Sequence, residues 1–335
     1  MSAANNQADV EFLLAKCVGR KVKIPDLLAL CPWDVEIAPW DESMEREIEL
    51  WRSRWIKDPT SLKRNRIVDP CLFARSVAPK ATSDGQLIVA KWAAWTFYWD
   101  DAHDFGEFDD RPEEVIAHRD QTIKLFYRSL YDEHPNSINP AEISPSYLTA
   151  QSVHEWGAVV GESSSLKDWL FEVFSDTCRA ISCVQHEFEK KTVLDLEAYR
   201  KIRMKSSGSL PTLACILYAD QVAFPDWFFN HELVKKAADL IDIIIWVVND
   251  IASQCKHIDN YVPLLVYHKG LTPQEAIDEA ASVAHQSYLD FEALEPQLIQ
   301  LGESRGYQVE RYVPWKPGMD RDDLYVVLGE DLPSE

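Results

Sequence analysis

Apolar residues recur at spacings of three and four over several long stretches of the chain, which is the period of an amphipathic α-helix. These stretches are 166–174, 181–188, 234–248 and 273–294. The last one opens with Thr272-Pro273-Gln274-Glu275, typical of a capped helix start with proline at the first helical position, and Lys269-Gly270 marks the end of the helix before it. Alternating strand patterns bounded by turn residues are scarce. The pattern therefore predicts an all-α fold.

The chain shows no division into separate segments. We find no internal repeat, no low-complexity tract and no stretch with the composition of an interdomain linker. A chain of 335 residues is long enough for one large helical domain. We therefore predict a single domain over residues 1–335, with an N-terminal segment (1–24) and a polar C-terminal tail (316–335) at its periphery.

Charge excludes several classes of partner. Lys and Arg number 34 against 55 Asp and Glu, which gives a net charge of −21. Nucleic acids and anionic membranes are bound by basic surfaces, so neither is an expected partner. The apolar run 243–248 is far too short for a membrane span. No GxGxxG or GxxxxGK[ST] pattern occurs, so a glycine-rich phosphate loop is excluded as well.

Cysteine usage indicates the compartment. The seven cysteines are scattered and contain no CxxC pair, which argues against a zinc ribbon or a disulfide framework. Reduced, buried thiols in an intracellular protein fit better. The polar start of the chain shows no secretory signal, so we expect a cytoplasmic protein.

A first candidate site follows an aromatic helix. Residues 91–99, rich in Trp, run into Asp100-Asp101-Ala102-His103-Asp104. On a helix the three aspartates share one face, where they would repel one another unless a cation lay between them. Carboxylate oxygens suit Mg²⁺, which keeps open positions for substrate phosphates. Phe97 lies one turn earlier on the same face. The alternative interpretation of the three aspartates is an acidic helix end exposed to water. His103 beside Asp104 also resembles an HD-type metal site, but no other histidine completes such a site.

A second candidate site follows the apolar run 243–248. Asn249, Ser253 and His257 are spaced by four and form one helical stripe. An amide oxygen and a hydroxyl on one stripe can bind a hard cation, although the pattern alone is ambiguous. The heavy aromatic content, with 12 Trp, 12 Tyr and 13 Phe, has two possible explanations, core packing or a cavity whose π faces bind a cation. Composition alone favours core packing.

The two motifs together resemble those of class I terpene synthases, in particular the single-domain fungal and bacterial enzymes. Asp100-Asp101-x-x-Asp104 matches the aspartate-rich motif of that family in full, and Asn249-Asp250-x-x-Ser253-x-x-Lys256 matches its second motif. The resemblance implies a helical barrel or bundle in which both motifs hold up to three Mg²⁺ ions against a substrate diphosphate. A homodimer is compatible with it. His257 replaces the family's glutamate and is a departure from the pattern.

Other positions extend the resemblance over roughly residues 68–312. Arg203 lies 46 residues before Asn249, as the family's diphosphate-sensing arginine does, and Arg311-Tyr312 matches its C-terminal pair. Ser206, Ser207 and Gly208 fall where the family has a helix break. Asp320-Arg321-Asp322-Asp323 matches the DxDD motif of class II cyclases, but it lies in a polar tail that we expect to be solvated.

The resemblance implies a Mg²⁺-dependent cyclase that ionises a linear isoprenyl diphosphate and cyclises the cation to a sesquiterpene. The expected substrate is farnesyl diphosphate, which single-domain family members of this size most often use. The expected residues are, for catalysis, Asp100, Asp101, Arg203, Asn249 and Ser253; for diphosphate, Arg203, Lys256, Arg311 and Tyr312; for metal, Asp100, Asp101, Asp104, Asn249, Ser253 and His257; and for the cavity wall, Trp92, Phe97, Trp246, Ser207 and Gly208.

Two other functions and three roles for His257 stay open. A chain-elongating prenyltransferase would need a second aspartate-rich motif where this chain has Asn249 and Ser253, and a non-catalytic diphosphate binder would fit the loss of the glutamate. His257 leaves its metal site weakened, or a neighbouring acid (Asp250 or Asp259) compensates, or the protonated imidazole binds diphosphate directly beside Lys256. We favour the weakened site.

Overall fold

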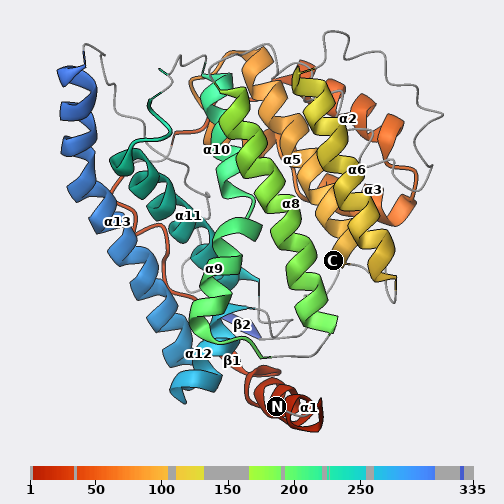
Figure 1. Cartoon of the computed structure of the whole chain (residues 1–335), viewed down its shortest axis with the longest axis vertical. Helices are drawn as coiled ribbons and strands as arrows, with labels where there is room; N and C mark the ends of the chain where they lie inside the picture. Colours follow the sequence, from red (N-terminus) through yellow and green to blue (C-terminus); the bar gives the residue numbers. More distant parts are fainter. Residues whose placement is uncertain are drawn as a thin grey trace. The chain divides into compact units, whose positions relative to one another are not determined.

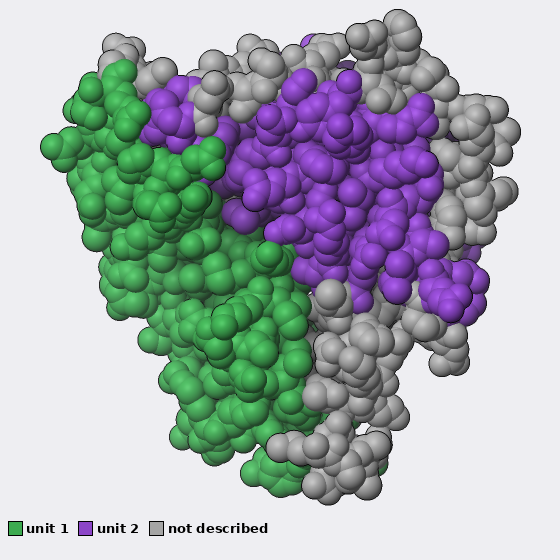
Figure 2. Space-filling view, in the orientation of Figure 1, with its two compact units in different colours: residues 1–34, 186–209, 230–335 green, residues 35–185, 210–229 purple. Residues whose placement is uncertain are grey.

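The computed structural model describes residues 3–33, 36–104, 111–131, 166–189, 193–220, 225, 227–253, 260–305 and 325–327. Helices dominate these ranges (Figure 1), which confirms the all-α prediction. The chain divides into two compact units, coloured separately in Figure 2. Unit 1 comprises residues 1–34, 186–209 and 230–335, and unit 2 comprises 35–185 and 210–229. Each unit combines segments that are distant in sequence. The single-domain organisation stays a prediction.

Unit 2 contains α2 (Glu42–Trp55), α3 (Pro59–Ile67), α4 (Pro70–Val77), α5 (Ser83–Asp104), α6 (Pro112–Tyr131), most of α8 (Lys167–Glu189) and all but the first residue of α10 (Ser209–Ala219). Aspartates cap its short helices: Asp41, Asp58 and Asp69 accept backbone N–H bonds at the starts of α2, α3 and α4. Such caps satisfy amides that have no partner within the helix, so each boundary is set locally.

Helix α5 lies against α2, α3 and α4. Trp92, Trp95 and Trp99 are each 2% exposed, and the centroids of the Trp92 and Trp95 rings lie 5.3 Å apart. Polar contacts fix α3 to α5, since Asn65 Nδ2 donates to the carbonyl oxygen of Ala94 at 2.7 Å. The aromatic run before the first motif is therefore largely core, and it holds the aspartate-bearing end of α5 on a rigid support.

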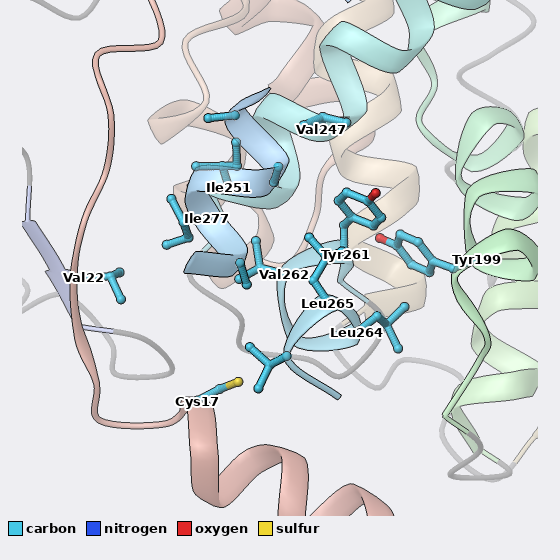
Figure 3. Packing of buried hydrophobic residues seen from close by; sticks show 14 of the residues in the cluster. Cys17, Val22, Tyr199, Val247, Ile251, Tyr261, Val262, Leu264, Leu265 and Ile277 are labelled. Carbon is cyan, nitrogen blue, oxygen red and sulfur yellow. The ribbon is translucent and has the colours of Figure 1, made fainter. Parts of the chain in front are cut away.

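Unit 1 contains α1 (Ala3–Cys17), β1 (Lys21–Lys23), α9 (Leu196–Ser206), α11 (Glu232–Ala252), α12 (Tyr261–Lys269), α13 (Pro273–Ser304) and β2 (Tyr325–Val327). Helix α13 packs along α11 and α12. Its predicted start is confirmed, because Thr272 and Glu275 form a reciprocal capping box. Gly270, with φ of 68°, ends α12 as predicted. Buried side chains from α11, α12 and α13 form the apolar cluster of Figure 3.

The N-terminal segment supplies part of this core. Leu13, Cys17 and Val22 are buried in the same cluster, and β1 pairs antiparallel with β2 of the C-terminal tail in the register Val22↔Val326. Both segments were expected at the periphery. The pairing was not predictable locally, because a three-residue strand gains its hydrogen bonds only from a partner some 300 residues away.

Two further expectations concern cysteines and membranes. Cys17, Cys31, Cys71, Cys178 and Cys215 are free and buried, as the scattered spacing indicated. No helix in the described ranges combines the length and apolar character that a bilayer crossing requires.

Candidate active site

The first motif lies in the last turns of α5, where Asp100 and Asp101 are both partly buried. Arg64 of α3 donates from Nε to Asp101 Oδ2 at 3.0 Å, and Arg64 Nη2 contacts Ser61 Oγ at 3.2 Å. Burial raises the pKa of the Asp101 carboxyl, and the Arg64 contact opposes that rise. The sequence did not single out Arg64 as a site residue, because it lies 37 residues before its partner Asp101 and no motif surrounds it.

The helix face beside the motif holds one exposed aromatic. Phe97 is 39% exposed one turn before the aspartates, whereas Trp92 is buried and its Nε1 donates to Thr212 Oγ1 at 2.9 Å. Asp104 belongs to α5, but its side chain lies outside the described residues. The cavity roles of Phe97 and Trp92 stay predictions.

The second motif lies at the C-terminal end of α11, where Asn249 and Ser253 are exposed. Arg203 of α9 reaches this helix: its Nη2 donates to Asn249 Oδ1 at 2.7 Å, and its Nε donates to Asp250 Oδ1 at 3.0 Å. The structure thus brings together the arginine and the asparagine that the sequence singled out. A guanidinium held by two acceptors is fixed in direction, because its planar fork allows few alternative geometries.

Asp250 anchors this arrangement and is only 2% exposed. Its Oδ2 accepts from Tyr199 OH at 2.5 Å and from the Tyr261 N–H at 3.0 Å, while Oδ1 accepts from Arg203. The Tyr199 and Tyr261 rings stack with centroids 6.4 Å apart. Both side chains are labelled in Figure 3. The carboxylate of Asp250 is buried and both of its oxygens accept hydrogen bonds, which argues against Asp250 as the acid that compensates for His257.

Ser253 is oriented by a residue that the sequence did not single out. Asn260 Nδ2 donates to Ser253 Oγ and to the carbonyl oxygen of Asp250, both at 2.8 Å, while its Oδ1 caps α12 by accepting from the Val262 N–H at 2.9 Å. The position of Asn260 before an apolar helix is a helix-cap signal, so its presence at a helix start was readable. Its contact with Ser253 was not.

The predicted cavity residues of unit 1 lie in two places. Trp246 is fully buried, with its ring edge-on to Tyr261 at 5.3 Å and to Tyr199 at 6.2 Å. Ser207 and Gly208 form the break between α9 and α10, where Gly208 has a φ of 73°. Their roles as cavity walls stay predictions. Lys256, His257, Arg311, Tyr312 and residues 320–323 lie outside the described residues.

The chemistry of the donors decides which metal they suit. Carboxylates on α5 and an amide oxygen and a hydroxyl on α11 are hard oxygen ligands, which fit Mg²⁺ better than a thiophilic ion. Within the described ranges, no three His, Cys, Asp or Glu side chains converge as a complete metal site. By the chemistry of their donors, the described residues of each motif fit Mg²⁺.

Comparison with known proteins identifies the family. A model described as terpene synthase family 2, C-terminal metal binding, matches residues 91–289, a span that contains both motifs and Arg203. The chain therefore belongs to this terpene synthase family. As a class I terpene synthase, it is a lyase.

Curated relatives and solved structures agree with this assignment. The chain is 25% identical to germacrene A synthase of Nostoc punctiforme over 84% of this chain and 87% of that protein. It is 24% identical to silphinene synthase of Penicillium patulum over 87% and 80%. The structure of hedycaryol synthase in complex with HEPES superposes with a TM-score of 0.71 at 20% identity, covering 84% of this chain and 88% of that one. That likeness shows a shared fold.

Proposed function

We propose that this protein cyclises farnesyl diphosphate to a sesquiterpene with release of diphosphate. The observation that carries the proposal is the pairing of Arg203 with the second motif, because it joins two elements that are distant in sequence at one site. The aspartate motif on α5 supplies the other half of the expected machinery. The family assignment and relatives named as sesquiterpene synthases support the fifteen-carbon substrate.

Ionisation of an allylic diphosphate requires that the negative charge developing on the leaving group be neutralised. Up to three Mg²⁺ ions, held by Asp100, Asp101 and Asp104 of the first motif and by Asn249, Ser253 and His257 of the second, would supply most of that neutralisation when bound. Arg203 adds a fixed cation, since Asn249 and Asp250 hold its guanidinium in one direction. Lys256, Arg311 and Tyr312 are proposed to contact the diphosphate as well.

The remaining task is to protect a carbocation from water. Aromatic side chains attract cations through their π faces and exclude solvent, so Phe97 and Trp92 are proposed wall residues on α5. Trp246, Ser207 and Gly208 are proposed as wall residues within unit 1. The five free, buried thiols of the described residues suit a reducing compartment, which supports the cytoplasm as the site of this reaction.

Product analysis tests the proposal directly. The purified full chain is incubated with farnesyl diphosphate and Mg²⁺, with and without isopentenyl diphosphate, and products are analysed by gas chromatography with mass spectrometry. A cyclic fifteen-carbon product from farnesyl diphosphate alone is expected, and Asp100→Asn serves as the control against a contaminating cyclase. A longer linear diphosphate formed only with isopentenyl diphosphate would indicate chain elongation instead. Tight binding of farnesyl diphosphate without turnover would indicate a binding protein. Either result overturns the proposal.

A further inference from the structure

A buried carboxylate lies beside the break between α9 and α10. Asp242 of α11 is 1% exposed, and its Oδ1 accepts a hydrogen bond from Ser207 Oγ at 2.6 Å and another from Ser209 Oγ. Its second oxygen, Oδ2, is buried and has no hydrogen-bond partner among the described residues. Burying a carboxylate is costly unless it is paired, so core packing alone does not account for an acid at this position.

The two serines flank the residue that allows the chain to turn. Gly208 adopts a left-handed conformation with φ of 73°, between the end of α9 at Ser206 and the start of α10 at Ser209. The Ser209 N–H donates to Ser207 Oγ at 3.2 Å, so the Ser207 hydroxyl caps α10 while it donates to Asp242. Asp242 therefore determines how that hydroxyl is directed and holds both sides of the break.

The same stretch of chain holds Arg203. The Ser207 N–H donates to the carbonyl oxygen of Arg203 at 3.0 Å, so the break begins at the turn that carries the arginine. Asn249 lies seven residues after Asp242 on α11, on the same helix face two turns further along. Helix α11 thus forms hydrogen bonds to the end of α9 at two points. Asn249 and Asp250 accept from the Arg203 guanidinium, and Asp242 accepts from Ser207 at the break.

We propose that Asp242 is a positioning residue, which fixes the α9–α10 break through the two serine hydroxyls and thereby sets how Arg203 presents its guanidinium to the substrate diphosphate. This inference rests on the proposed function of the site. Asp242 itself does not contact substrate, because its carboxyl group is enclosed by protein. Its effect on the reaction is exerted through Ser207, Ser209 and the last turn of α9.

The decisive comparison is between two substitutions of similar size. Asp242→Asn retains an oxygen that accepts from both serines, whereas Asp242→Leu retains none. We expect Asp242→Leu to lower kcat by about tenfold to a hundredfold and to change the ratio of terpene products, because small displacements of positioning groups cost that much. Asp242→Asn should stay within about threefold of the wild-type kcat on the same grounds. The control is Glu232→Gln, an exposed acid at the start of the same helix.

A second measurement does not depend on turnover. Hydrogen exchange at the Ser209 amide should accelerate in Asp242→Leu and stay near the wild-type rate in Asp242→Asn, because only the leucine releases the capping hydroxyl of Ser207. If Asp242→Leu does not fold, Ser209→Ala replaces it, with a smaller effect in the same direction. A wild-type protein that makes no terpene would contradict the proposed function. The exchange measurement would still test whether Asp242 fixes the α9–α10 break through the two serine hydroxyls.

Two results would overturn the inference. In the first, a folded Asp242→Leu variant, or Ser209→Ala where the leucine does not fold, keeps the wild-type kcat, product ratio and exchange rate. In the second, Asp242→Asn is as impaired as Asp242→Leu, which would mean that the negative charge of the acid is required and its hydrogen bonds are not.

Discussion

At the scale of single residues, we propose that charge and geometry at the two motifs decide function. Asp101 combines two demands, because its carboxylate pairs with Arg64 at 3.0 Å and is also a proposed metal ligand. Arg203 has an equally constrained position, between Asn249 and Asp250. Each of these side chains is therefore expected to respond sharply to substitution, even where the replacement is close in size.

Loss of a carboxylate from the first motif should disable ionisation. Asp100→Asn and Asp101→Asn are each expected to lower kcat by about a hundredfold, the usual effect of removing one stabiliser of developing charge. Steady-state kinetics with farnesyl diphosphate and Mg²⁺ measure this, with Asp84→Asn at the exposed start of α5 as the matched control. Near-normal turnover by Asp101→Asn would remove it from the metal site and leave it as the partner of Arg64.

Arg203→Lys should be damaging although it preserves charge. Lysine is a point charge and cannot replace a guanidinium that donates at once to Asn249 and Asp250. We expect kcat/KM for farnesyl diphosphate to fall at least about tenfold, since a charge-assisted contact is lost. Arg200→Lys on the same helix is the control. Ordinary kinetics in Arg203→Lys would exclude a diphosphate-sensing role.

His257 gives a prediction about metal demand that rests on the sequence alone. Imidazole is a poor ligand for Mg²⁺, so His257→Glu should lower the Mg²⁺ concentration that gives half-maximal rate. His257→Ala should retain substantial activity, because the imidazole contributes little to the site. Rates measured across a MgCl₂ titration test both variants. Complete loss of activity in a folded His257→Ala protein would show that the imidazole is essential.

At the scale of elements, the break between α9 and α10 connects fold and chemistry. Gly208 and Gly270 both adopt left-handed backbone conformations, with φ of 73° and 68°. Apart from the adjacent residues, a Cβ added at either would meet no atom of the described residues within 4 Å. Alanine at either position is therefore penalised by its backbone conformation and not by a clash. This makes the two glycines a matched pair, one beside the proposed site and one at the end of α12.

Gly208→Ala and Gly270→Ala should lower the free energy of unfolding by a similar amount, about 1 kcal/mol each. Only Gly208→Ala should also lower kcat, because it alters the turn that follows Arg203. Urea denaturation and steady-state kinetics on both variants separate the two effects. Equal activity in the two proteins would show that the break has no role in catalysis.

At the scale of the whole molecule, stability should depend on pH through a buried acid. Burial raises the pKa of Asp242 from 3.8 to about 7, against the opposing influence of Ser207, Ser209 and Arg203, and with a further rise from the charge of Asp239. Between these two pH values the folded state holds a proton that the unfolded state has lost. The contribution to stability is therefore present at low pH and is lost as pH rises through 7.

The free energy of unfolding should accordingly fall between about pH 4 and about pH 7 more steeply in the wild type than in Asp242→Asn, which has no titrating group at this position. Urea denaturation at several pH values measures the difference between the two proteins. The stability of Asp242→Asn relative to wild type should increase with pH up to about 7, where the acid ionises. A difference that does not vary with pH would show that Asp242 is ionised throughout.

The sequence by itself determined the helical class, several helix boundaries and the identity of both motifs. These features are local: a period near 3.6 predicts a helix, a Thr272–Glu275 capping box starts α13, and the proposed ligands Asn249 and Ser253 recur at one-turn spacing. The spacing of Arg203 from Asn249 came from resemblance to a family, and the structure gives its physical reason in a 2.7 Å hydrogen bond.

Only the tertiary structure decided which side chains meet across distant segments. Four contacts join residues that no local sequence pattern connects. They are the ion pair of Arg64 with Asp101, the three hydrogen bonds donated to Asp250, the hydrogen bond from Asn260 to Ser253, and the strand pair β1–β2. The position of Asp242 beside the α9–α10 break was also decided only by the tertiary structure. The sequence shows an acid within an apolar helix, but it does not show which residues surround that acid. Such contacts depend on packing between elements, and the energy of a buried charge depends on those same neighbours.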